Sequence, residues 1–74
     1  MIVYVVSRRI CYEEGAENLA VFETSDSACG FALDQPTLAG SLWTEVEMLQ
    51  DKHHVMTLHN RGEFIDVERF DMVN

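Results

Sequence analysis

The residues best suited to chemistry in this chain are three histidines, His53, His54 and His59, which follow Asp51. Imidazole and carboxylate groups are ligands that zinc takes in proteins. Neighbouring side chains point in different directions on both a helix and a strand, so His53 and His54 cannot both join His59 without a specific turn. We therefore predict no metal site. We expect polar residues at a helix end, where a protonated imidazole interacts favourably with the C-terminal dipole.

The two cysteines, Cys11 and Cys29, are the other candidates for reactive groups. No apolar run is long enough for a signal-peptide core, so we expect a reducing compartment and no structural disulfide. No Cys-x-x-Cys pair of a zinc ribbon or redox site is present, and both residues are predicted to lie in or beside the core. The alternative is a metal- or thiol-dependent regulator that uses these cysteines or the three histidines.

Enzyme signatures are missing from the sequence. The four glycines are isolated, which excludes a phosphate-binding loop of the Walker or dinucleotide type. Neither a nucleophile elbow nor a His-Glu-x-x-His motif occurs. A domain of this size rarely encloses a pocket that keeps out water. We therefore expect no enzymatic activity and no cofactor.

Acidic residues dominate the charge of the chain. Thirteen Asp and Glu against five Lys and Arg give a formal net charge of -8, although 47% of the residues are hydrophobic. This combination predicts a folded acidic domain and not a disordered acidic tail. Its field repels nucleic acid and anionic membranes and attracts basic protein surfaces. The alternative is that the charge serves solubility alone.

The apolar patterns indicate the elements that would position these residues. Residues 2–9 predict a strand near the middle of a sheet, with apolar side chains on both faces. An acidic loop at 13–18 separates this strand from the apolar run 19–22, which predicts a β-hairpin. A Thr-Ser-Asp sequence typical of a helix N-cap then precedes a stripe of small and apolar residues, which predicts a helix over 25–33 that ends before the next proline.

The second half of the chain is predicted to add another helix and another hairpin. Apolar residues recur at three- and four-residue steps in 36–52, which favours an amphipathic helix, whereas the alternation from 42 to 48 would suit a strand. The runs 55–58 and 64–70 flank a polar turn and predict a hairpin. The sum is a single small α+β domain over residues 1–74: an antiparallel sheet of about four strands with one or two helices packed on it, in the order strand-strand-helix-helix-strand-strand.

Alternation in the final strand places acidic and aromatic side chains on one face, with Asp66 and Glu68 between Phe64 and Phe70. Acids about 6 to 7 Å apart along a strand match the spacing of phosphates along nucleic acid, so this row is the predicted protein-binding surface of a DNA mimic. A second acidic strip is expected at Glu45, Glu47 and Asp51. The alternative is a solvated strand face whose phenylalanines fold over neighbouring residues.

Three further residues have expected structural roles. Trp43 is predicted to anchor the core, with an interface hot spot as the alternative. Arg8 and Arg9 end the first strand and are expected to pair with nearby acids such as Glu13. These arginines are too few to neutralise phosphates, so we predict no direct binding to nucleic acid.

Part of the sequence resembles small uncharacterised proteins frequent in bacteriophage genomes. The resemblance is carried by the first strand at 1–6, by Val-Phe-Glu-Thr-Ser at 21–25 leading into a helix, and by Ile-Asp-Val-Glu-Arg-Phe-Asp at 65–71. It departs in the helix at 28–32, and residues 34–62 have no counterpart. The resemblance implies no activity, only a phage context in which small accessory proteins bind and inhibit host machinery.

These observations together predict a non-enzymatic acidic protein-binding module, a phage-encoded inhibitor that masks a basic, nucleic-acid-binding surface of a host protein. It would act in the host cytoplasm. The first alternative is a homo-oligomeric structural protein whose two-sided apolar first strand is completed by a neighbouring copy. The second is the metal- or thiol-dependent regulator described above.

Overall fold

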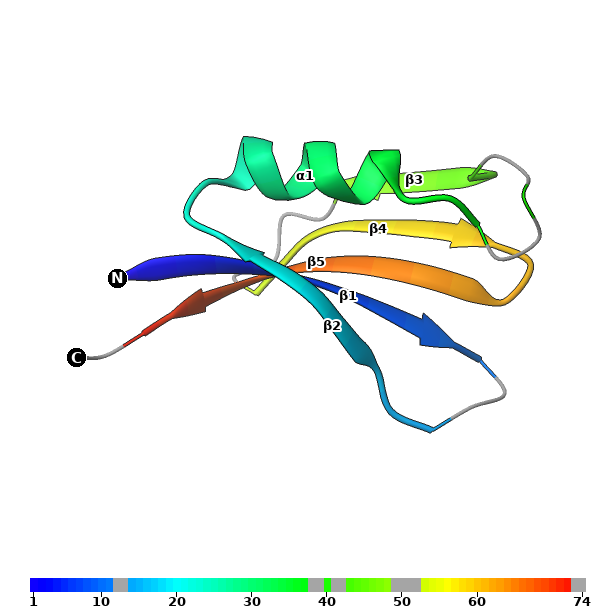
Figure 1. The fold of residues 1–74 in the computed structure, drawn as a ribbon, viewed down its shortest axis with the longest axis horizontal. Coiled ribbons are helices and arrows are strands. Elements are labelled where there is room, and N and C mark those ends of the chain that lie inside the picture. The colour runs from blue at the N-terminus through cyan, green and yellow to red at the C-terminus, as the bar shows by residue number, and fades with distance from the viewer. Residues whose placement is uncertain (12–13, 38–39, 41–42, 49–52, 73–74) are drawn as a thin grey trace.

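The computed structural model describes residues 1–11, 14–37, 40, 43–48 and 53–72. In these ranges the elements follow one another as β1 (Ile2–Ile10), β2 (Glu17–Phe22), α1 (Ser25–Asp34), β3 (Glu45–Met48), β4 (His54–Asn60) and β5 (Glu63–Asp71). Figure 1 shows the helix lying across one side of the strands. No helix in the described ranges is both long and apolar enough to cross a bilayer.

All five strands belong to one antiparallel sheet, in the spatial order β2-β1-β5-β4-β3. β5 is central and pairs with β1 along both strands, from Ile2 opposite Asp71 to Ile10 opposite Glu63. β1 therefore has a neighbour on each side, as expected for a strand inside a sheet. Pairing of the first and last strands also brings Met1 and Met72 together, and the Met1 amino group donates to the Met72 carbonyl at 3.1 Å.

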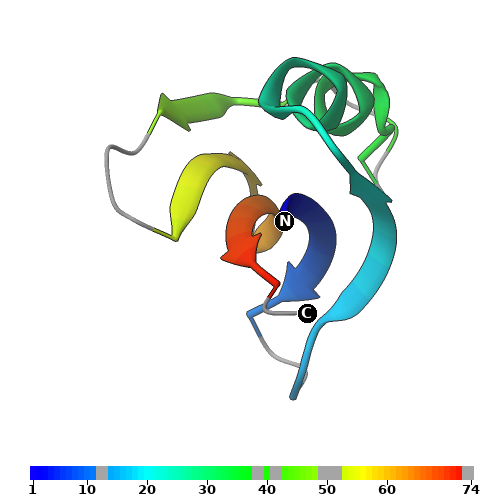
Figure 2. The same cartoon turned by 90° about the vertical axis from the view of Figure 1, so that its left-hand side faces the viewer.

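The sheet is strongly curled, and α1 lies across its open side (Figure 2). Five buried strand residues form the concave side of the core: Val6, Met56, Leu58, Ile65 and Val67. The helix contributes Ala28 and Ala32, whose small side chains let its backbone approach the sheet closely. The core thus occupies the space between the helix and the concave face.

Local sequence signals explain where α1 begins and ends. Thr24 is the N-cap residue, and its Oγ1 accepts a hydrogen bond from the Ser27 amide at 3.2 Å. The helix stops before Pro36, because the residue before a proline avoids the helical region, and Gln35 is extended with φ -70 and ψ 130. Trp43 donates from Nε1 to the Gln35 carbonyl at 2.8 Å and packs against the core, so its predicted anchoring role is confirmed.

The two hairpins and the capped helix are confirmed, but the predicted helix over 36–52 and the predicted element order are wrong. Glu45–Met48 is a strand, and the observed order is β-β-α-β-β-β with five strands and, in the described ranges, one helix. Val46 and Met48 stand opposite Leu58 and Met56 of β4. The edge of β4 offers hydrogen-bond partners to the backbone, and alternate apolar residues suit a strand, so pairing outweighs the helical spacing. Residues 38–39, 41–42 and 49–52 lie outside the described ranges.

Candidate functional site

The described residues of the two predicted acidic strips lie on the same face of the sheet. Residues that stand opposite each other in an antiparallel ladder point to the same side. Glu47 stands opposite Thr57, and Thr57 stands opposite Asp66. Glu45 and Glu47 on β3 therefore share one face with Asp66 and Glu68 on β5, and β4 lies between the two strips.

We call the side turned away from α1 the convex face. The strand registers place these described residues on it: Val3, Val5, Ser7, Arg9, Asn18, Val21, Glu45, Glu47, His54, Thr57, His59, Phe64, Asp66, Glu68 and Phe70. The two glutamates of β3 and Phe70 are exposed, whereas Phe64 and Glu68 are half-buried. Asp51, the third member of the predicted second strip, lies outside the described ranges.

Asp66 is buried, although it lies on the convex face. Its Oδ2 accepts a hydrogen bond from Arg9 Nε at 2.7 Å, and its Oδ1 accepts one from Thr57 Oγ1 at 2.9 Å. The Asp66 side chain is 4% exposed, against 44% for Arg9. β1 and β4 lie on either side of β5, so one side chain from each neighbouring strand donates a hydrogen bond to the carboxylate. Of the two acids predicted to form an exposed row on β5, Asp66 thus lies inside the fold and Glu68 faces solvent in part.

Phe64 is contacted from both neighbouring strands. The guanidinium carbon of Arg9 on β1 lies 4.0 Å from the ring centroid of Phe64. The His59 ring on β4 is stacked on the same phenylalanine, with centroids 4.5 Å apart and an interplanar angle of 7°. Together with Glu45 on β3, these residues form a row across four strands. The aromatic ring is thus fixed between a cation and an imidazole and not left free in solvent.

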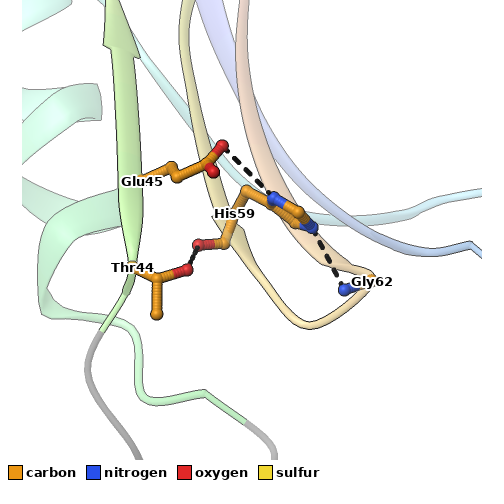
Figure 3. A network of polar contacts seen from close by, with 4 residues as sticks. All are labelled: Thr44, Glu45, His59 and Gly62. Carbon is orange, nitrogen blue, oxygen red and sulfur yellow. Dashed lines mark hydrogen bonds and ion pairs between the residues drawn. The ribbon is translucent and has the colours of Figure 1, made fainter.

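His59 is held in one orientation by β3 and by the β4–β5 turn (Figure 3). Its Nδ1 lies 3.4 Å from Glu45 Oε2, and its Nε2 accepts a hydrogen bond from the Gly62 amide at 3.1 Å. Because Nε2 accepts, the ring proton resides on Nδ1 and is directed toward the glutamate. The backbone also anchors the residue, since Thr44 Oγ1 donates to the His59 carbonyl at 2.9 Å. A metal at Nε2 would have to displace the Gly62 amide.

The other two histidines lie away from His59. His54 begins β4, His53 precedes it, and His59 is near the opposite end of that strand. A strand rises about 3.3 Å per residue, which puts five residues at roughly 16 Å. In the described part of the chain, no three His, Cys, Asp or Glu side chains are close enough to share a metal ion. The predicted helix end that would carry His53 and His54 is replaced by the start of a strand.

The two cysteines are free and differ in environment. Cys11 is exposed, and Cys29 on α1 is half-buried. Burial raises the pKa of the Cys29 thiol, a hydrogen bond with Ser25 opposes this rise, and the negative charge of Asp26 adds to it. A raised pKa keeps the thiol protonated, which is the opposite of what a nucleophilic cysteine needs.

A hollow of about 300 Å³ lies where β1 runs into the β1–β2 connection. Charged side chains of both signs line it: Arg8, Arg9, Glu14 and Glu17. Arg8 also donates from its guanidinium to the Pro36 carbonyl at 3.0 Å, so it ties β1 to the segment after the helix. The predicted partner of these arginines, Glu13, lies outside the described ranges, and Arg9 pairs with Asp66 instead.

No family model, no curated protein and no solved structure matches this chain.

Sequence reasoning missed the Arg9–Asp66 pair and the contacts that hold Phe64. The paired residues are 57 positions apart, and their contact depends on the register between β1 and β5. A signal was present, because the first strand has apolar residues on both faces and such strands lie inside sheets. Pairing the first strand with the last in the observed register would have placed Arg9 opposite Phe64.

Proposed function

We propose that this protein is a non-enzymatic binding module whose convex face occupies a basic surface of another protein. The observation that carries the proposal is the placement of three solvent-accessible acids, Glu45, Glu47 and Glu68, on one sheet face, the side opposite α1. In its most specific form, the module is a phage-encoded inhibitor that masks the nucleic-acid-binding surface of a host protein.

The distribution of charge supports a basic partner. Glu45 and Glu47 present their carboxylates to solvent, and Glu68 does so in part. The charge of Arg9, the arginine that the register places on this face, is compensated by Asp66. Exposed charges of one sign steer an oppositely charged surface into place and make binding sensitive to salt.

The spacing of the acidic strips supports the imitation of phosphates. Two acids on one strand face lie about 6 to 7 Å apart, close to the spacing of phosphates along a nucleic-acid strand. β3 and β5 are separated by β4, so the two strips are about 10 Å apart, a distance between the widths of the minor and major grooves. Because Asp66 is buried and paired with Arg9, the exposed carboxylates on this face are those of Glu45 and Glu47 on β3 and, in part, Glu68 on β5. A groove that binds phosphates could accept these three carboxylates.

Aromatic side chains on the same face supply apolar contact area. Phe70 is 42% exposed near one end of β5. Phe64 is half-buried near the other end and is held by Arg9 and His59. A fixed aromatic ring loses little conformational entropy when a partner covers it, which is typical of interface anchors.

Partner capture with charge-neutralised variants tests the proposal. The immobilised protein is exposed to bacterial lysate at low salt, and bound proteins are eluted with high salt and identified by mass. The test variant combines Glu45→Gln, Glu47→Gln and Glu68→Gln. We expect basic nucleic-acid-handling proteins in the wild-type eluate and their loss with this variant.

A matched variant separates the convex face from net charge. Glu14→Gln, Glu17→Gln and Glu23→Gln remove the same number of charges from exposed residues of the β1–β2 region. This variant should retain the salt-sensitive proteins. Equal recovery by both variants, or binding that does not fall with rising salt, would contradict a site on the convex face.

A second candidate function, self-association, has an observation of its own in favour. Val3 and Val5 of β1 point to the convex face, opposite Phe70 and Glu68, and are half-buried there. A second copy could cover these residues and complete the two-sided apolar strand. Light scattering at micromolar concentration decides this alternative: a dimer that Val5→Asp dissociates would support it, and a monomer would remove it.

A further inference from the structure

The concave face of the sheet extends beyond the area that the helix covers. Val46 and Met48 of β3 stand opposite Leu58 and Met56, so they point to the same side as these two buried residues. Nevertheless, Val46 is 54% exposed and Met48 is 64% exposed. α1 contacts β1, β2, β4 and β5 but not β3, which explains the exposure.

The helix also leaves an apolar residue exposed, on its flank away from β2. Phe31 packs on Phe22 of β2, with ring centroids 5.3 Å apart, so that flank of α1 is turned toward β2. Leu33 lies two residues further, about 200° around the helix, on the flank away from β2. It is 51% exposed. We call Val46 and Met48 the β3 strip.

β3 is also an open edge of the sheet. Among the described strands it pairs with β4 alone, so the other side of its backbone has no strand partner. An edge strand of this kind is a template for an added strand. The opposite edge strand, β2, has a register shift where it pairs with β1 at Val6 and Ser7, whereas the pairing of β3 with β4 is regular. Bulges protect an edge from further pairing, so β3 is the more receptive edge.

We infer that β3 accepts an added β-strand: an extended segment of a basic partner protein in which Lys or Arg alternates with apolar residues. Its apolar side chains would cover the β3 strip on the concave side. Its cations would lie beside Glu45 and Glu47 on the convex face, because the two sets alternate along β3. The positive charge of the partner segment rests on the proposed function, whereas binding by strand addition goes beyond that function.

Charge argues against a second copy of this chain as the occupant. Any register that places Val46 and Met48 beside the same residues of another copy also places glutamate beside glutamate. Like charges directly opposite each other on neighbouring strands are destabilising, and each copy already has a net charge of -8. An alternating basic strand can place apolar side chains against the concave side of β3 and cations beside the glutamates on its convex side.

Three peptides built from the same amino acids test the inference against the full protein. The first alternates Lys and Val over eight residues, the second groups the lysines and valines in two blocks, and the third is the alternating peptide with an N-methyl group on every amide, so that neither of its edges can donate hydrogen bonds. We expect the alternating peptide to bind about tenfold more tightly than the other two, since only it can pair along β3 and bury its valines. Its binding should slow the hydrogen exchange of the Glu45–Met48 amides.

One substitution separates strand addition from simple charge attraction. Val46→Asp makes β3 more acidic, so charge alone would tighten the binding of a lysine peptide. Loss of the apolar contact should weaken it instead, by about tenfold. Val21→Asp is the matched control, because Val21 is 61% exposed on the other edge strand and should leave peptide affinity unchanged or slightly higher.

The outcomes distinguish this inference from the proposed function. Equal affinities for the three peptides, lost on neutralising Glu45 and Glu47, would overturn strand addition and leave the charge-based function intact. Tighter binding by Val46→Asp, or exchange protection at β2 in place of β3, would also overturn it. Failure of all three peptides at low salt would contradict both, and dimers of the free protein that Val46→Asp dissociates would identify a second copy as the occupant.

Discussion

The buried carboxylate of Asp66 joins three strands at the centre of the sheet. It accepts hydrogen bonds from Arg9 on β1 and from Thr57 on β4, while its own backbone belongs to β5. Arg9 in turn lies over the ring of Phe64. Removing the carboxylate would free the guanidinium and loosen the aromatic contacts on the convex face, so Asp66 is a structural residue beneath the proposed binding surface.

We expect Asp66→Asn to lower the free energy of unfolding by about 2 kcal/mol. A fully buried pair would cost more to break, but Arg9 is 44% exposed and water can compensate it in part. Urea denaturation measures the change. Glu68→Gln is the control, since this residue neighbours Asp66 on the same strand face and should shift stability by less than about 0.5 kcal/mol. An Asp66→Asn protein as stable as wild type that no longer binds its partner would show a direct contact instead.

The two thiols should differ in their response to pH. The pKa of Cys29 is raised above its ordinary value of 9.0, chiefly by burial, so the folded state holds this thiol protonated. The stability that the protonated Cys29 thiol contributes is therefore fully present below the pKa of the thiol in the unfolded chain. It is lost as pH rises through the higher pKa of the thiol in the folded protein. With a chromogenic disulfide reagent in mildly alkaline buffer, exposed Cys11 should react quickly and Cys29 slowly. Cys11→Ser should abolish the fast phase, and equal rates for the two thiols would contradict the assignment.

At the scale of elements, the β4–β5 hairpin depends on two residues with positive φ. They lie in the polar turn that the sequence predicts and are Arg61, with φ 50, and Gly62, with φ 82. Two such residues in succession form the turn that best matches the twist of a hairpin. Gly62 also donates its amide to His59 Nε2. The turn therefore positions a residue of the convex face.

Gly62→Ala should destabilise the protein by about 2 kcal/mol, from backbone strain together with a steric clash. An added Cβ would lie 2.7 Å from Cys11 Sγ. Gly15→Ala is a matched control, because Gly15 has φ +81 but open space around its Cβ position, so it should show the strain alone. Thermal unfolding compares the two variants. Combining Gly62→Ala with Cys11→Ala should remove the extra loss of stability that Gly62→Ala shows over Gly15→Ala. Equal losses of stability for the two glycine substitutions would exclude the clash.

Local signals were enough to predict some elements and insufficient for others. The N-cap at Thr24 and the proline at 36 act within one turn of the chain, so the limits of α1 could be predicted closely. In 36–52, helical and alternating patterns occur together, and β4 decides between them through its open edge. The sharing of one face by Glu47 and Asp66 depends in the same way on two strand registers that no local pattern encodes.

At the scale of the whole molecule, the charge must act on folding and on binding at the same time. The net charge of -8 is confined to a body of 39 × 25 × 20 Å, so many acids lie within one or two Debye lengths of each other. Their mutual repulsion opposes the compact state. The same field attracts a basic partner. Screening should therefore have opposite effects on the two processes.

We expect sodium chloride to raise the melting temperature of the free protein and to weaken its complex with a basic partner over the same concentration range. Differential scanning calorimetry and titration calorimetry measure the two trends. Salt should weaken the Arg9–Asp66 ion pair only slightly, because its carboxylate is buried and less accessible to salt. The pair should therefore subtract little from the gain in stability. In a variant with Glu14→Gln, Glu17→Gln and Glu23→Gln, the rise in melting temperature should shrink while the loss of affinity with salt persists. If that variant lost both trends together, binding would depend on total charge and not on the acids of the convex face.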